Sequence, residues 1–323
     1  MKLPFTSRPS EIPNEEYHRG EQYRDYFSSS MIKNYLISPK FARYSQLNPS
    51  NSDTPAKQEG TIYHDLLESH TNHGNDSTFP WVTFNFKAPI NPSTSKAYGV
   101  VSAKYQNAYE IELADFMVDN PGVKVGPENF IINAKNMVGE LLNGNPHLSP
   151  DIATFIKNGV AEQSHFLEYK GGLYKFRTDV KTRSKIIDWK KTRLGCPKIE
   201  NWGKEVVNYG YHISAAMYQL LEKEISGKWK PFYWVAQENE PPYDFNIIDA
   251  SGWTYEISGG VVTKLNSGAL ILAKLMGQHQ WCNDNQQWPG YSSFTQPNLR
   301  GRRIARSKTP GWYENKVLAT FYN

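Results

Sequence analysis

The sequence predicts an α/β fold, in which a mixed sheet is flanked by helices on both faces. Between residues 164 and 190, three short runs that mix apolar and polar residues are separated by polar turns, which predicts an antiparallel three-strand meander. The run Lys230–Gln237 is nearly continuously apolar and predicts a buried strand. Stretches with helical periodicity precede and follow these strands.

The N-terminal half is predicted to be mostly helix and loop. Residues 1–28 are polar, with several prolines and tyrosines, and are expected to form an N-terminal arm. Ser29–Tyr44 suits a short amphipathic helix with serine caps, interrupted at Pro39. A loop is expected at 46–58 and a helix start at Gly60–Glu68. The remaining elements predicted before residue 160 are a strand at Trp81–Phe86 and helices at about 101–118, 131–143 and 150–157.

The C-terminal half carries the predicted sheet. The three strands of the meander are Ser164–Tyr169, Leu173–Val180 and Lys185–Lys190. Further expected elements are a long helix at Trp202–Lys223, the strands Lys230–Gln237 and Tyr243–Ile248, and a helical stretch around 254–277. The main domain is predicted to cover 29–295, followed by a basic tail at 296–323.

Composition excludes several classes of protein. The chain of 323 residues has a formal charge of +4, which is compatible with a polyanionic partner. Cys196 and Cys282 show no metal-ligand spacing and indicate a reducing compartment. There is no signal-peptide pattern and no apolar run long enough for a membrane span, so a soluble cytoplasmic protein is expected. P-loop, zincin and serine-hydrolase motifs are absent from the sequence.

Two aspartates and one lysine of the meander form the strongest candidate site. Residues two apart in a strand share a face, so Asp188 and Lys190 should point the same way, with Ile187 and Trp189 facing the opposite layer. Asp179 lies one hairpin earlier, where it can meet Asp188. Carboxylates that hold Mg²⁺ or Mn²⁺ can neutralise a phosphate, activate water and stabilise a leaving alkoxide. The pattern fits the requirements of metal-dependent phosphodiester hydrolysis.

The acid-x-Lys tripeptide alone is not specific. The chain contains four such matches, of which two place the lysine in a turn and one lies in the tail. For the match at 188–190, a surface salt-bridge ladder on a hairpin is the alternative explanation. Only the match at 188–190 follows an apolar strand start and has another aspartate one hairpin earlier.

Short islands, in the right order and spacing, make the sequence similar to the PD-(D/E)XK nuclease superfamily. They are SSMIKNYLISPKFARY from Ser29, GTIYH ending at His64, Glu162, Arg177-Thr178-Asp179, IIDWKKT around Asp188, and Trp288-Pro289-Gly290-Tyr291 after a cysteine. Within the superfamily the chain most resembles the exodeoxyribonuclease VIII (RecE-like) group of phage-type recombination exonucleases. The resemblance implies a PD-(D/E)XK, restriction-endonuclease-like core.

The resemblance also implies roles for individual residues. His64, Asp179 and Asp188 would ligate Mg²⁺, with Mn²⁺ able to substitute, Lys190 would handle the nucleophilic water, and Glu162 would add a further carboxylate. The implied activity is 5′→3′ degradation of linear double-stranded DNA, which would feed a single-strand annealing protein during recombination. Members of the group form rings, so a homo-oligomer is also expected.

One helix departs from the family pattern. Tyr211 and Tyr218 match the family's Tyr-His-x-Gln-x-x-x-Tyr motif and would lie near the site, but Ser214 stands where glutamine is expected. Gln219 is about 100° around the helix and is no simple substitute. The departure bears on the level of activity or on recognition of DNA ends.

Several of these residues have alternative interpretations. His64 alone would usually be a helix histidine with its hydrogen bonds satisfied, Glu162 competes with Glu168 or could be a surface charge, and Tyr218 could be a core aromatic. His70-x-x-His73 has metal-compatible spacing but runs into a loop.

Basic residues are the candidates for DNA contacts. Lys181, Arg183, Lys185, Lys191 and Arg193 surround the acidic centre, and Arg177 belongs to one of the islands. Arg300, Arg302 and Arg303 in the tail would add sequence-independent contacts to phosphates, although a solubilising tail explains them equally well. The competing functions are an endonuclease or single-strand nuclease on the same core, and a catalytically inactive DNA-binding protein.

Overall fold

A mixed sheet forms the centre of the molecule in a computed structural model that describes residues 5–6, 12–49 and 54–290. The strand order is β1-β4-β5-β6-β7-β8. β6 and β7 are parallel, whereas the other neighbours are antiparallel. The strands are β1 (Phe5–Thr6), β4 (Val160–Tyr169), β5 (Gly172–Lys181), β6 (Ile186–Thr192), β7 (Phe232–Glu238) and β8 (Phe245–Asp249). The predicted α/β class, mixed sheet and antiparallel meander are therefore confirmed.

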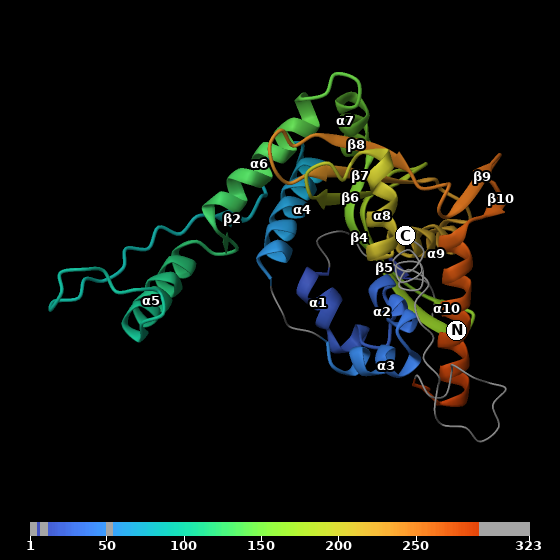
Figure 1. Cartoon of the computed structure of the whole chain (residues 1–323), viewed down its shortest axis with the longest axis horizontal. Coiled ribbons are helices and arrows are strands. Elements are labelled where there is room, and N and C mark those ends of the chain that lie inside the picture. The colour runs from blue at the N-terminus through green and yellow to red at the C-terminus, as the bar shows by residue number, and fades with distance from the viewer. Residues whose placement is uncertain (1–4, 7–11, 50–53, 291–323) are drawn as a thin grey trace, which may run out of the picture.

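One face of the sheet is covered by α4 (Pro55–His73), α6 (Glu128–Asn143) and α7 (Ser149–Asn158). Their apolar side chains join Ile187 and Trp189 of β6 in one core cluster (Figure 1). α4 begins earlier than predicted, because Thr54 caps its first turn and Pro55 occupies the first helical position. The early start lengthens the helix that carries His64.

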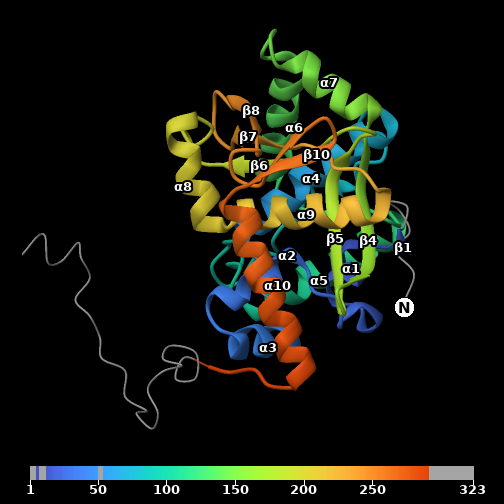
Figure 2. The ribbon, with the colours of Figure 1, turned by 90° about the vertical axis from the view of Figure 1, so that its right-hand side faces the viewer.

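The other face is covered by α8 (Ile199–Tyr209), α9 (Tyr211–Ser226) and α10 (Ser267–Asn285). Figure 2 shows α9 crossing β4 and β5, with α10 running past the end of α9. The single long helix predicted at 202–223 is wrong. Gly210 adopts a left-handed conformation with φ of 62°, which ends α8 and turns the chain into α9.

Two further elements pack beside α10. The serine-rich stretch forms α2 (Ser29–Lys33), a 3₁₀ turn (Asn34–Leu36) and α3 (Pro39–Leu47), so Pro39 starts a second helix under the Ser38 cap.

The helix predicted from residue 254 is also wrong in its first part. Residues there form a hairpin of β9 (Tyr255–Ser258) and β10 (Val261–Leu265), because Gly259 and Gly260 supply a tight turn with positive φ.

The described part of the N-terminal arm packs against the sheet. α1 (Asn14–Arg19) and a 3₁₀ turn (Glu21–Tyr23) follow Ile12, and Tyr17 is buried against Phe166 of β4. Phe27 pairs with Tyr174 of β5. This packing brings α1 to the same side of the sheet as the acidic residues.

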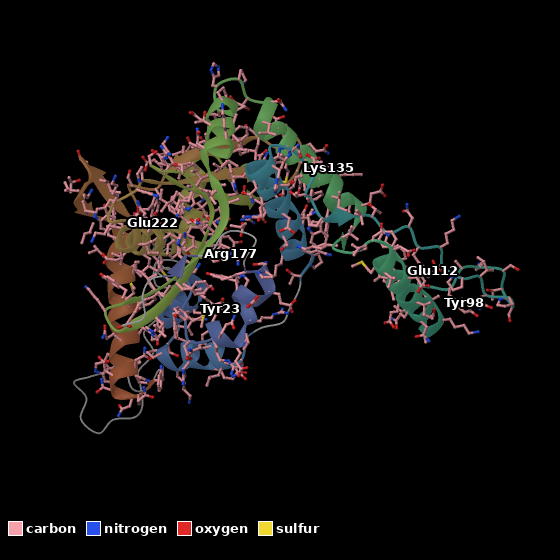
Figure 3. The ribbon with its side chains drawn as sticks, turned by 180° about the vertical axis from the view of Figure 1, so that it is seen from behind. Tyr23, Tyr98, Glu112, Lys135, Arg177 and Glu222 are labelled. Atoms are coloured by element: carbon pink, nitrogen blue, oxygen red, sulfur yellow. The ribbon has the colours of Figure 1, made fainter. Side chains whose placement is uncertain are left out.

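A projecting arm lies between α4 and α6. It contains β2 (Trp81–Val82), which is shorter than the predicted strand, then α5 (Ala103–Asp119) and β3 (Lys124–Val125). α5 contributes no buried residue and extends away from the sheet (Figure 1). Tyr98 and Glu112 lie on this arm, far from Arg177 within the body (Figure 3). Within the described ranges, no helix is both long and apolar enough to span a membrane.

Candidate metal centre

The sheet opens between β5 and β6 at the predicted site. The two strands pair only through Val180 with Ile187 and Lys181 with Ile186. Beyond this pairing, Oδ2 of Asp179 accepts a hydrogen bond of 2.8 Å from the Trp189 backbone amide. A carboxylate thus takes the place that a strand carbonyl would occupy, and the site lies where the strands separate.

Asp188 and Lys190 lie on the same face of β6, as their spacing predicts. Nζ of Lys190 is 2.6 Å from Oδ2 of Asp188 and 5.3 Å from the centre of the Tyr211 ring. Ile187 and Trp189 are buried in the opposite layer. The ammonium is therefore held between a carboxylate and an aromatic face.

Glu162 approaches the site through an unusual backbone conformation. β4 and β5 pair at Ala161–Val180 and at Gln163–Thr178, but Glu162 between them has a φ of 49°. A left-handed conformation in a non-glycine residue costs about 1–3 kcal/mol and persists where the surrounding structure enforces it. Oε1 of Glu162 lies 3.9 Å from Nδ1 of His64. The distorted strand therefore delivers a carboxylate to α4.

His64 completes a cluster of possible metal ligands. Nδ1 of His64 is 3.6 Å from Oδ2 of Asp179. His64, Glu162 and Asp179 each offer one ligand atom, and these atoms all lie within 4.8 Å of one another. Burial disfavours the imidazolium, but the Asp179 and Glu162 carboxylates outweigh burial and raise the pKa of His64 to about 9. The cluster therefore attracts positive charge.

Asp188 stands beside this cluster rather than inside it. Burial raises its pKa to about 6, since the neighbouring Asp179 carboxylate adds to the effect and the Lys190 ammonium only partly offsets it. Burial opposes the charge on Lys190, but Asp188 and Asp179 raise its pKa above the ordinary lysine value. Asp188 and Lys190 therefore form an ion pair at the edge of the acidic cluster.

The donor set fits a hard divalent cation. Oxygen ligands from carboxylates are those that Mg²⁺ and Mn²⁺ prefer, and imidazole is also a ligand for transition metals. Two carboxylates and one imidazole converge here, with the Asp188 carboxylate beside Asp179. Such crowding of like charge is unfavourable unless a cation compensates it.

Two residues near the site were not singled out in the sequence. Glu68 is one turn after His64 on α4, and burial together with Glu162 and Asp65 raises its pKa to about 7. Its i+4 spacing from His64 was the available signal. Burial and the neighbouring Lys190 lower the pKa of Lys33 to about 8. No local pattern pointed to Lys33, because α2 approaches β6 only in the folded chain.

The tyrosine helix, α9, lies over the same end of the sheet. Tyr218 is among the residues that line the cleft of the acidic cluster, and burial raises its pKa. Tyr211 stacks on Trp202 and lies under Lys190. Gln219 donates a hydrogen bond of 2.9 Å to the Lys230 carbonyl. It therefore does not substitute for the glutamine that the family motif has at the position of Ser214.

The alternative ligand candidates from the sequence, Glu168, His70 and His73, lie away from the acidic cluster. Glu168 pairs in register with Leu173 at the far end of β4. His70 contacts Asp76 at 2.9 Å, and His73 ends α4. Neither histidine belongs to the ligand cluster that the described residues form.

The predicted DNA contacts have different surroundings. Arg177 bonds to Ser164 and to the Ile12 carbonyl, lies 3.9 Å from Glu162, and lines the cleft. Lys191 is paired with Glu59 on α4. Arg193 is 78% exposed and contacts Glu205 at 3.0 Å. Arg300, Arg302 and Arg303 lie outside the described residues.

A meander that carries Asp179 and Asp188-x-Lys190 beside a helix histidine defines a PD-(D/E)XK-like protein. Residues 28–296 match the family model of the PDDEXK-like domain of unknown function (DUF3799), and the chain belongs to that family. The expected superfamily is thereby confirmed, while the narrower RecE-like assignment stays a prediction.

A crystal structure from Eubacterium rectale, described as a "putative exonuclease", aligns with 93% of this chain and 96% of that chain, at 13% identity and a TM-score of 0.49. No curated protein matches the chain.

Proposed function

We propose that the protein is a divalent-metal-dependent nuclease that hydrolyses phosphodiester bonds in DNA. The observation that carries the proposal is the convergence of His64, Glu162 and Asp179 within 4.8 Å, next to the Asp188–Lys190 pair. Membership of a PDDEXK-like family supports it. We assign the activity to residues 29–295, with the arm at 1–28 adding to the walls of the cleft.

His64, Glu162, Asp179 and Asp188 would hold Mg²⁺, or Mn²⁺ in its place. A cation bound there neutralises the phosphate and lowers the pKa of water. Asp179 is held in place by the Trp189 amide, and Glu162 by the distorted strand. Both carboxylates are therefore preorganised, which lowers the cost of assembling the site.

Lys190 would act as a cation that orients the attacking water and contacts a phosphate oxygen. Asp188 and the Tyr211 ring fix the position of its ammonium, and its raised pKa keeps it protonated at neutral pH. A charged ammonium stabilises negative charge as it develops on the phosphate. Tyr211 and Tyr218 would act by positioning the groups that they contact.

Basic residues beside the acids would guide the DNA. Lys57, Lys124 and Arg177 line the cleft of about 520 Å³ that contains the acidic cluster. The residues predicted from the sequence to contact the DNA backbone stay part of this proposal: Arg177, Lys191 and Arg193, with Arg300, Arg302 and Arg303 of the tail. Such contacts add affinity without sequence preference.

The finer proposal follows the resemblance to RecE-like exonucleases. It is 5′→3′ degradation of linear duplex DNA in phage-type recombination, by a homo-oligomeric ring that passes its product to an annealing protein. Purified protein should degrade linear duplex with Mg²⁺ and leave closed circular duplex intact. Equal cleavage of both substrates would indicate an endonuclease instead.

Substituting Lys190 tests the proposed chemistry. The assay follows an end-labelled linear duplex, with Mg²⁺ or with EDTA, for the wild type, Lys190→Met and Lys274→Met. Lys274 is exposed on α10 and controls for the loss of a lysine. We expect cleavage by the wild type and the control only with Mg²⁺, and a loss of about 10²-fold or more in Lys190→Met. A wild type that binds DNA but never cuts it would favour the inactive DNA-binding alternative.

A further inference from the structure

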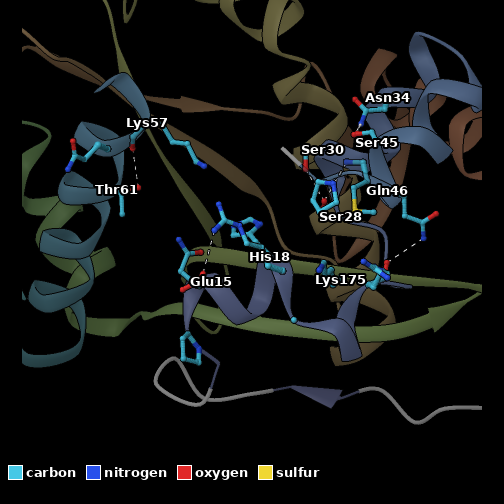
Figure 4. Close-up of a pocket in the computed structure, with 18 of the residues that line it drawn as sticks. Glu15, His18, Ser28, Ser30, Asn34, Ser45, Gln46, Lys57, Thr61 and Lys175 are labelled. Carbon is cyan, nitrogen blue, oxygen red and sulfur yellow. Dashed lines mark hydrogen bonds and ion pairs between the residues drawn. The ribbon is translucent and has the colours of Figure 1, made fainter. Parts of the chain in front are cut away.

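A second, larger chamber opens beside the metal centre. Its volume is about 1000 Å³, and its walls come from α1, α2, α3, the start of α4, and the β2 and β3 strands of the projecting arm between α4 and α6. Figure 4 shows Lys57 and Thr61 on α4 at one side, Glu15 and His18 on α1 in the middle, and Asn34 and Gln46 on the opposite wall. Among these side chains, the proposed function uses only Lys57, as a cation that guides the DNA.

The chamber is continuous with the cleft of the acidic cluster. Seven residues line both spaces: Asn14, His18, Ser28, Ser30, Lys57, Thr61 and Lys124. Thr61 is one turn before His64 on α4, so the shared wall leads directly to the candidate ligands. A chain that reaches the metal centre can therefore continue into the chamber.

The balance of charge differs between the two spaces. The cleft is lined by four acids, Asp65, Glu68, Glu162 and Asp179, and by three cations, Lys57, Lys124 and Arg177. The chamber is the more cationic of the two, since five cationic side chains and one acid line it: Arg19, Arg24, Lys57, Lys124 and Lys175, with Glu15. Of these, Lys124 is paired with Asp65 at 2.7 Å, and the buried Lys175 ammonium donates to the Tyr17 and Tyr23 carbonyls. The acid of the chamber, Glu15, is bonded to Arg19 at 3.4 Å. The chamber therefore suits an anion, next to a centre that suits a cation.

The behaviour of His18 agrees with this positive field. Partial desolvation of its ring lowers its pKa to about 4, and the cations Lys175, Arg177, Lys57 and Arg19 add to the effect, although the residue is exposed on the chamber wall. His18 is therefore neutral at physiological pH and does not add a charge. It remains able to form hydrogen bonds within the chamber.

We propose that the chamber binds a short stretch of a single DNA strand, roughly two or three nucleotides, adjacent to the bond held at the metal centre. Pockets of roughly 300–1,000 Å³ hold one small ligand, so a volume at the top of that range holds a few nucleotides. A cube of the same volume has an edge of about 10 Å, whereas a B-DNA duplex is at least about 16 Å across, because its major and minor grooves are about 8.5 and 7.5 Å deep on opposite sides of the base pairs. The substrate strand is therefore unpaired where it enters.

The lining provides the groups that single strands use. Cationic side chains contact successive phosphates, and Ser30, Ser45 and Asn34 add polar groups. Trp81 in the wall offers an aromatic surface on which a base stacks. The inference rests on the proposed nuclease function, because the strand is placed by its path to the acidic cluster.

Strand binding in EDTA tests the chamber without any cleavage. Fluorescence anisotropy of a labelled oligothymidylate is measured with the full chain and with Arg24→Glu and Lys57→Glu, whose residues are both exposed on the chamber wall. Lys274→Glu makes the same charge change on α10. Each chamber variant should weaken binding by about ten-fold. The slope of log K against log salt concentration should become shallower by about 0.7 for each phosphate contact that is lost. The control should stay within about two-fold of the wild type.

Two results would overturn the inference. One is strand binding that neither chamber variant weakens relative to Lys274→Glu. The other is a blunt duplex of equal length that binds as tightly as the single strand and loses as much affinity in the variants. If the wild type cleaves DNA while the variants bind normally, only the chamber is misassigned. If the variants lose binding but no protein cleaves DNA, only the nuclease proposal fails.

Discussion

Replacing His64 with glutamine removes a protonated imidazole from between two carboxylates. The Asp179 and Glu162 oxygens lie 3.6 and 3.9 Å from Nδ1. Burial lowers the pKa of His64, but the carboxylates outweigh it and raise the pKa from 6.5 to about 9. A raised folded-state pKa means that the stabilisation is fully present below pH 6.5. It is lost as the pH rises through 9.

The size of this contribution follows from the same shift. A rise from 6.5 to about 9 corresponds to about 3 kcal/mol of favourable interaction with the charged imidazole. The side chain remains 29% exposed, so solvent screens part of the attraction. We therefore compare the free energy of unfolding of the metal-free wild type with that of metal-free His64→Gln. The wild type's advantage over the variant should be about 1–3 kcal/mol larger at pH 6 than at pH 10.

Denaturant unfolding of both proteins in EDTA, at about pH 6 and about pH 10, measures this difference. Other groups also titrate in this range. Burial lowers the pKa of Lys33 and of Lys175 to about 8, and burial with neighbouring carboxylates raises the pKa of Glu68 to about 7 and that of Asp188 to about 6. These groups are present in both proteins, so their own contributions cancel in the comparison. An identical pH dependence of stability in the two proteins would refute the assignment of His64 to the acidic cluster.

Three further substitutions test the packing around the site, each by denaturant unfolding. Glu222→Gln should lower the free energy of unfolding by about 3–5 kcal/mol, because Glu222 is 2% exposed and lies 3.2 and 2.8 Å from the ammonium groups of Lys181 and Lys230. Gly210→Ala should cost about 1 kcal/mol or more, since its φ is 62° and the added Cβ would lie 2.8 Å from a Lys33 carbon. Trp189→Ala should cost about 3–5 kcal/mol, because the indole is 1% exposed beneath Asp188 and Lys190.

An exposed ion pair provides the matched control for Glu222. Glu256 contacts Lys264 at 3.3 Å on the β9–β10 hairpin, with both side chains largely in solvent. Glu256→Gln should change stability by no more than about 0.5 kcal/mol. Similar losses in Glu222→Gln and Glu256→Gln would contradict the view that burial makes the first pair important.

Local periodicity is enough to predict the strand that carries Asp188 and Lys190. Alternation along IIDWKKT places Asp188 and Lys190 on one face and Trp189 on the other, because the side-chain period of a strand is two. The turn residues after Tyr169 and Val180 marked the corners of the meander. These features depend on neighbouring residues and are therefore visible in the sequence.

Two element boundaries that differ from the prediction, the α8–α9 junction and the β9–β10 turn, contain glycines. At both places the surrounding helical periodicity favoured a continuous helix. Gly210 lies within an otherwise helical pattern, and a single glycine is often tolerated in a helix. Gly259-Gly260 lies between β-branched residues, but the helical pattern that follows obscured the hairpin. Only the three-dimensional packing determines which interpretation applies.

The finer geometry of the site depends on contacts between distant segments. The left-handed conformation of Glu162 and the bond from the Trp189 amide to Asp179 arise where three strands meet. The pKa values of Glu68 and Lys33 shift because burial and neighbouring charges act on them. No local pattern in the sequence encodes these effects.

Binding of Mn²⁺ to the purified chain tests the central claim most directly. Isothermal titration compares the wild type with Asp179→Asn, whose amide oxygen can still accept the Trp189 hydrogen bond while the ligand charge is removed. We expect the wild type to bind Mn²⁺ and the variant to bind it more than about ten-fold more weakly. Equal affinity in the two proteins, or no binding to either, would contradict a metal centre at the opening between β5 and β6.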